Sequence, residues 1–149
     1  MASINWRTLD ILMGISSPGS CGAKKTVHVR RDIEIVFSGS YAVIFPDTMS
    51  LSSCGAVEVQ ALTVTDENGN PMPAGTTIAL TASGNISFTD GASASFKVLS
   101  SNQTSKTTNY AFTITSPTAC KAGDRGNIKV VVTVPSGVAS TKYIPTTVR

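Results

Sequence analysis

The chain has 149 residues, the size of one ordinary domain, of which 41% are hydrophobic and 14% charged. This balance is too apolar for a disordered chain, and the net charge of +3 is too small for a nucleic-acid-binding surface. No apolar run approaches the roughly 20 residues that a membrane-spanning helix needs. We therefore expect a folded domain that neither binds nucleic acid nor inserts into a membrane.

Residues 1–40 predict an extension that precedes the main domain. Trp6, Leu9 and Met13 favour one short helix, because they recur at helical spacing. Residues 24–37 carry alternating Val and Ile and predict one long strand or two. The extension is therefore expected to be rich in β-structure.

Residues 41–149 predict a series of short strands separated by Gly, Pro, Asn and Ser. Alternating apolar residues mark segments 56–66, 76–83, 86–88, 94–98, 110–114, 128–134 and 140–148. Because proline cannot donate a backbone hydrogen bond, Pro145 predicts that the last of these segments is an edge strand or a strand end. Strands at this spacing are typical of an all-β sandwich.

The apolar phase changes within the segment 56–66. Val57 and Val59 share one phase, whereas Leu62 and Val64 share the other, which predicts a bulge near Ala61. The clean alternation in the later segments predicts a core between two sheets. That core is expected to contain Ile78, Leu80, Phe96, Val98, Tyr110, Phe112, Ile114, Ile128, Val130 and Val132.

A turn motif follows the segment 56–66 and is the most specific signal in the chain. It consists of Asp66, Asn68, Gly69, Asn70 and Pro71. Asn-Gly tolerates a left-handed backbone and Pro pre-sets a turn, so these residues predict a tight turn by themselves.

The stretch that contains the motif resembles the first strand and turn of bacterial immunoglobulin-like domains of the invasin/intimin type (the Big family). The resemblance covers residues 44–149, although residues 101–108 lack the second Asp-x-Asn-Gly of that family. It implies an immunoglobulin-like β-sandwich of about seven to nine strands. It also implies a non-catalytic module of a bacterial surface or extracellular protein that acts as a spacer or binding stalk.

Two segments of the chain are similar to one another. Residues 15–21 (Ile-Ser-Ser-Pro-Gly-Ser-Cys) parallel residues 114–120 (Ile-Thr-Ser-Pro-Thr-Ala-Cys), 99 positions later. This offset is about the length of one immunoglobulin-type sandwich. The extension is therefore either the tail of a preceding repeat or a strand that is added to a neighbouring copy, unless the similarity arose by chance.

The three cysteines, Cys21, Cys54 and Cys120, include no C-x-x-C pair, and the chain has a single histidine, so no zinc site is expected. In the implied sandwich the loops before two of the strands can meet at one end. We therefore expect a Cys54–Cys120 disulfide with Cys21 free, provided that the protein is exported. Three free thiols are the alternative and would indicate an intracellular origin, such as a virion component.

The residues offer little for catalysis. The acidic residues and amides at Asp66–Asn70 lack the spacing of a calcium loop, and His28, the sole imidazole, lies in a basic segment. We expect no catalytic, metal or cofactor site. The aromatic residues that could form a sugar-binding face are Trp6, Tyr41, Tyr110 and Tyr143, and they are not clustered in the sequence.

Three functions remain open at this point. The first is the adhesive or spacer module, whose partner is an unidentified protein or surface glycan together with neighbouring immunoglobulin-like modules. The second is a self-assembling subunit of a virion or surface filament that uses the N-terminal segment for strand addition. The third is a carbohydrate-binding module.

Overall fold

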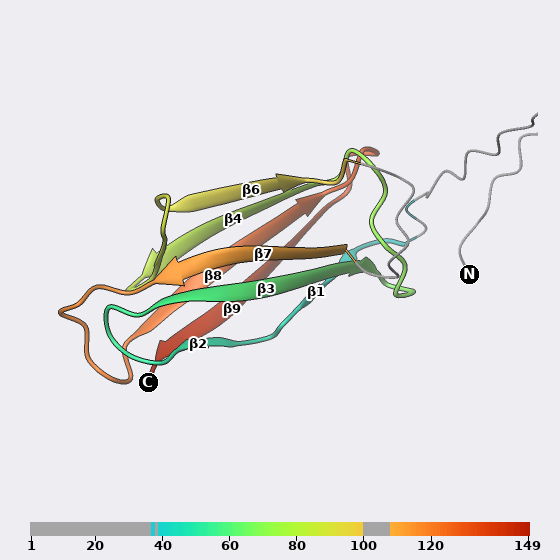
Figure 1. Cartoon of the computed structure of the whole chain (residues 1–149). Coiled ribbons are helices and arrows are strands. Elements are labelled where there is room, and N and C mark those ends of the chain that lie inside the picture. Colours follow the sequence, from blue (N-terminus) through green and yellow to red (C-terminus); the bar gives the residue numbers. More distant parts are fainter. Residues whose placement is uncertain (1–36, 38, 100–107) are drawn as a thin grey trace, which may run out of the picture.

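The computed structural model describes residues 37, 39–99 and 108–149, which form nine strands (Figure 1). The strands are β1 (Ala42–Phe45), β2 (Met49–Leu51), β3 (Val57–Asp66), β4 (Thr77–Gly84), β5 (Ser87–Phe88), β6 (Ser93–Lys97), β7 (Thr108–Thr115), β8 (Arg125–Thr133) and β9 (Ala139–Val148). These described residues contain no helix. The predicted helix at the N-terminus lies outside them.

The strands form two sheets that pack face to face. One sheet has the order β1-β3-β7-β5 and the other has the order β2-β9-β8-β4-β6. All neighbouring strands are antiparallel except β2 and β9, which are parallel. This arrangement is an immunoglobulin-like β-sandwich, which confirms the predicted fold class.

The first two strands divide one edge of the sandwich between the two sheets. β1 pairs with the end of β3, and after a cis peptide bond at Phe45-Pro46 the chain crosses to the other sheet, where β2 pairs with β9. Lys142 secures the crossing, because its ammonium donates to the Ile44 carbonyl and to the Asp47 carboxylate. The crossing leaves the remainder of β3 without β1 beside it.

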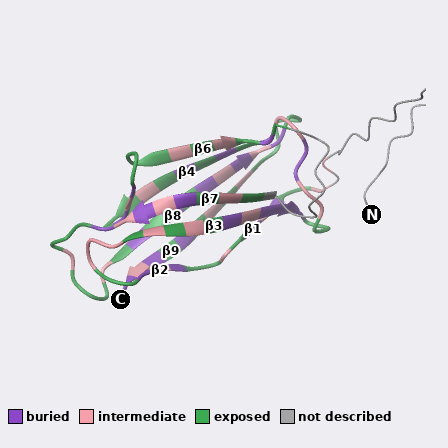
Figure 2. Cartoon of the chain, viewed as in Figure 1, coloured by how far each residue is buried: buried purple, intermediate pink, exposed green. Residues whose placement is uncertain are grey.

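The core fills the space between the sheets with aliphatic side chains. Eight of the ten predicted core residues are buried, and Ile78, Leu80, Ile114, Ile128 and Val130 are completely inaccessible. The other two predicted residues, Phe96 and Tyr110, are only partly buried and pack on one another with ring centroids 4.9 Å apart. Figure 2 shows the buried residues alternating with exposed ones along the strands.

The predicted bulge near Ala61 is wrong. The β3–β7 register runs without interruption from Val57 opposite Thr115 to Val64 opposite Thr108. The apolar phase changes because the surroundings of the strand change along its length. Near Val64 the apolar residues of β3 are on the inward face and are buried in the core, whereas near Val57 they are on the outward face and are exposed.

The prediction that Pro145 places the last segment at an edge also needs correction. β9 lies between β2 and β8 and is an inner strand. The Val148 N–H donates to the Asp124 carbonyl and the Val148 carbonyl accepts from the Gly123 N–H, so the backbone polar groups of Val148 face β8. Because these groups alternate in direction along a strand, the nitrogen of Pro145 faces the other side. On that side β2 pairs only with residues 146–148. Proline is tolerated there because it removes no bond from the ladder.

All nine strands lie within residues 41–149, the domain expected from the sequence. The proposed extension, residues 1–40, and its strand at 24–37 fall almost entirely outside the described residues, so both stay predictions. The part of the chain that the structure describes has no helix long and apolar enough to cross a bilayer.

Candidate functional site

The turn motif is held together by the carboxylate of Asp66, which is buried at the end of β3. Its Oδ1 accepts hydrogen bonds from the N–H groups of Asn68 at 2.9 Å and Asn70 at 2.8 Å, and its Oδ2 accepts one from Asn70 Nδ2 at 2.9 Å. Gly69 has a φ of 78°, the left-handed conformation that a glycine adopts without strain. Pro71 then forms a bridge with Thr65 as the chain leaves the turn.

This geometry makes the motif structural. Three N–H donors already point at the Asp66 carboxylate, which is the arrangement of a side chain that closes a turn on its own backbone. Among the described residues there is no group of three His, Cys, Asp or Glu side chains that could hold a metal ion.

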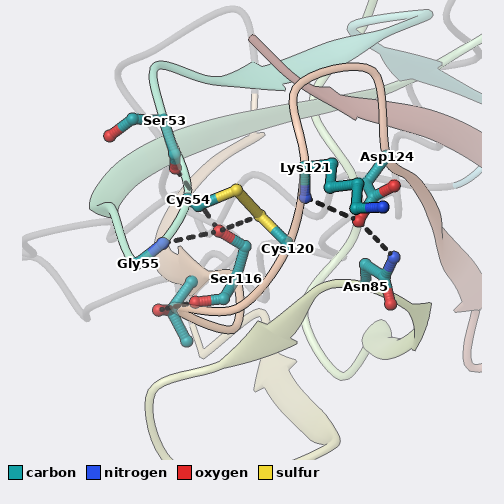
Figure 3. The surroundings of a disulfide bond; sticks show 9 residues. Ser53, Cys54, Gly55, Asn85, Ser116, Cys120, Lys121 and Asp124 are labelled. Atoms are coloured by element: carbon teal, nitrogen blue, oxygen red, sulfur yellow. Dashed lines mark hydrogen bonds between the residues drawn. A yellow bond between two sulfur atoms is a disulfide. The ribbon is translucent and has the colours of Figure 1, made fainter.

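The second feature is a cluster of loops at the opposite end of the sandwich, centred on a disulfide between Cys54 and Cys120 (Figure 3). Cys54 lies between β2 and β3, and Cys120 lies between β7 and β8. Their Cα atoms are 5.4 Å apart. The structure thus joins the two cysteines that the sequence analysis paired, and the third, Cys21, lies outside the described residues.

Hydrogen bonds reinforce the disulfide on both sides. The buried Ser116 accepts a bond from the Gly55 N–H at 3.1 Å and donates one to the Ser53 carbonyl at 3.4 Å. Beyond Cys120, the Asp124 carboxylate accepts bonds from the Lys121 N–H at 3.0 Å and from Asn85 Nδ2 at 2.9 Å. Figure 3 shows these groups converging from three loops. The cluster therefore fixes loop positions.

The third feature is a cleft bordered by β2, β3 and β9. It is lined by Thr48, Met49, Ser50, Glu58, Gln60, Thr147 and Arg149. The Ser52 N–H donates to Glu58 Oε1 at 2.7 Å, and Gln60 Nε2 donates to the Ser50 carbonyl at 3.4 Å. The cleft is polar and carries one charge of each sign.

Glu58 is a residue of the cleft whose carboxyl pKa is lowered by its surroundings. The hydroxyl of Ser52, together with its backbone N–H and the more distant Arg149, holds the pKa of the Glu58 carboxyl below its ordinary value. The sequence analysis did not find this cleft. The available signal was the placement of Glu58 and Gln60 in phase with the core residues Leu62 and Val64.

The aromatic residues do not assemble into a sugar-binding face within the described part of the chain. Tyr110 packs against Phe96, and burial raises the pKa of its hydroxyl. Tyr41 and Tyr143 are 54% and 62% exposed, but Tyr41 precedes β1 of one sheet and Tyr143 lies on β9 of the other. Trp6 and His28 lie outside the described residues.

Similarity to known proteins is found among solved structures. No family model matches it, and no curated protein does. Among solved structures it is similar to an ASH/PapD-like domain of human CEP192 (PapD-like domain 7), with 6% identity and a TM-score of 0.42. The alignment covers 86% of this chain and 96% of that domain. The assignment to the immunoglobulin-like sandwiches rests on the strand order itself.

Proposed function

We propose that this chain is a non-catalytic immunoglobulin-like module of a bacterial surface or extracellular protein, in which it serves as a spacer or binding stalk. The observation that carries the proposal is the Cys54–Cys120 disulfide, which joins two loops 66 residues apart in the sequence. Such bonds persist in secreted and surface proteins, whereas the cytosol keeps thiols reduced. The proposal includes membership of the invasin/intimin type, which the turn motif at Asp66–Pro71 supports.

The polar groups at the two ends of the sandwich support a structural role. Asp66 closes its turn, and Ser116 and Asp124 tie loops to one another. Each of these groups has its hydrogen-bonding partners in the protein itself. This is typical of a scaffold whose surface, not a catalytic centre, meets its partners.

A direct test is to isolate the protein from its native cells without reductant, denature it, and count the thiols that react with an alkylating agent. We expect one reactive thiol per chain, at Cys21, and a linked peptide that contains Cys54 and Cys120. Three reactive thiols would contradict both the disulfide and export. In that case, recovery of the protein in the intracellular fraction of the same cells would favour an intracellular assembly such as a virion.

One observation favours the second candidate function, the self-assembling subunit. It is the uncovered stretch of β3 beside the cleft, where the backbone groups of an added strand can pair.

A further inference from the structure

β3 is an inner strand of its sheet over only part of its length. β7 pairs with residues 57–64, whereas β1 pairs only with residues 63–66. β1 ends at Phe45 and the chain then crosses to the other sheet, so no described residue pairs with residues 57–62 on that side. An open stretch of this kind is a template on which another strand can pair.

The direction of the backbone groups on this edge follows from a neighbouring hydrogen bond. The Thr89 N–H donates to the Thr113 carbonyl at 3.3 Å, so Thr113 turns its backbone polar groups away from β3. Its partner Val59 then forms a non-hydrogen-bonded pair with it and turns its own N–H and C=O away from β7. By alternation, Val57 and Ala61 do the same. Three N–H and three C=O groups therefore face the open side.

The side chains beside this edge differ on its two faces. On the outward face Val57 is 60% exposed and Val59 is 72% exposed. On the inward face Glu58 and Gln60 line the cleft together with Arg149. The complementary strand is one with an apolar face, which pairs beside the valines, and a charged face, which enters the cleft.

The chain contains such a segment in residues 26–36, Thr-Val-His-Val-Arg-Arg-Asp-Ile-Glu-Ile-Val. In an extended conformation one face presents Val27, Val29, Ile33 and Ile35, interrupted by Arg31. The other face presents His28, Arg30, Asp32 and Glu34. This second face carries charges of both signs, as the cleft does with Glu58 and Arg149.

Distance limits how much of this segment could pair with the edge of its own molecule. The chain enters the sandwich at the far end of β3, where Ala42 pairs with Asp66 and Gly39 lies against Glu67. From Asp66 to Val59 the strand covers seven residues, about 23 Å at the usual rise of about 3.3 Å per residue. A chain that folded back on its own edge would use about seven residues before Gly39 only to cover that distance.

We propose that residues 57–61 of β3 form an acceptor edge, and that the strand added to it is residues 26–36 of a second copy of this chain. The donor segment precedes the Asp66 end of the sheet and the acceptor edge lies at the other end. Each copy therefore accepts one strand and donates another, a head-to-tail contact that can add copies in a series. This inference goes beyond the proposed function and does not depend on export.

The test is sedimentation velocity of the full chain over a series of concentrations, with two variants. The acceptor variant, Val57→Lys with Val59→Lys, places two charges on the edge. The donor variant, Ile33→Pro with Ile35→Pro, removes two N–H groups from the segment. We expect multiples of the monomer mass for the unchanged chain and only monomer for each variant. An equimolar mixture of the variants should form a one-to-one dimer and nothing larger, because each retains the half that the other lacks.

Tyr143→Lys, an exposed substitution on the other sheet, is the matched control and should assemble like the unchanged chain. Circular dichroism melting shows whether each variant is folded. If the acceptor variant does not fold, a labelled synthetic peptide of residues 24–37 replaces the mixture and should bind the donor variant. Three results would each overturn the proposal: a monomeric unchanged chain, assembly that survives both variants, or no complex in the mixture or with the peptide.

Discussion

The two ends of β3 share one strand, one register and one alternation, yet they are built in opposite ways. At the Asp66 end, β1 and β7 flank the strand, Leu62 and Val64 are fully buried, and a side chain closes the turn. At the Val57 end only β7 flanks it, polar residues point inward and valines point outward. Figure 2 shows the change from buried to exposed along the strand.

The contrast shows that the burial of a residue in β3 depends on the elements that flank it, and not on the strand itself. Beside β1, and at Leu62 one residue before it, the inward phase is apolar. Where the chain has crossed to the other sheet, a cleft borders β3 and the residues in the inward phase are polar. The disulfide and its loops then hold the open end together, as the core holds the closed end.

Replacing both Cys54 and Cys120 with alanine should lower the free energy of unfolding by roughly 4 kcal/mol, because the bond closes a loop of 66 residues. Denaturant unfolding of the oxidised chain and the double variant measures this. Reduction of the unchanged chain serves as the control and should reproduce the loss. Equal stability of all three samples would show that the open end does not need the bond.

Leu62→Ala should cost about 3 kcal/mol, since a fully buried leucine leaves a cavity in the core. The matched substitution at the other end, Val59→Ala, should change the stability by less than about 0.5 kcal/mol because that side chain is exposed. Thermal or denaturant unfolding measures both. Similar costs at the two positions would remove the distinction between the ends of the strand.

These two positions also show how far sequence reasoning could reach. The alternation of apolar residues correctly predicted seven of the nine strands, the two-sheet fold and most of the core, because a buried sheet face requires that period. It did not mark β1 or β2. The same alternation, applied to Val57 and Val59, predicted a bulge that does not exist. Periodicity reports which residues are apolar, but it does not report where a flanking strand ends.

The candidate sites follow the same rule. The turn at Asp66 could be predicted because its hydrogen bonds join residues at most four positions apart. The cleft could not, because it depends on the crossing after Phe45, which brings Ser50 and Arg149 near Glu58. The disulfide pairing needed the fold as an intermediate step, because only the sandwich brings Cys54 and Cys120 together.

Asp66→Ala should cost about 2 kcal/mol, because it leaves the N–H groups of Asn68 and Asn70 without their charged acceptor. The neighbouring exposed Glu67→Ala is the control and should be nearly neutral. Chemical denaturation compares the two variants. A neutral Asp66→Ala would mean that the turn forms without its side-chain bonds, and that the closed end depends on β1 and the core alone.

The smallest effect concerns Glu58 at the open end. Its pKa should lie below the ordinary value for glutamate, because Ser52 donates hydrogen bonds to the ionised form. The stabilisation by this carboxylate is therefore present above the unfolded-state pKa and is lost as the pH falls through the folded-state pKa. An NMR titration of the Glu58 side chain measures the value, and Ser52→Ala should raise it. An unchanged pKa in that variant would remove the Ser52 hydroxyl as a cause.

The open edge of β3 is tested most directly by residue-resolved amide hydrogen exchange on the donor variant, Ile33→Pro with Ile35→Pro, as a monomer. The account predicts alternation at the Val57 end. The amides of Val57, Val59 and Ala61 should exchange rapidly, whereas those of Glu58 and Gln60, which face β7, should be protected. In the assembled unchanged chain the three rapid amides should become protected. Uniform protection of residues 57–61 in the monomeric variant would contradict an open edge.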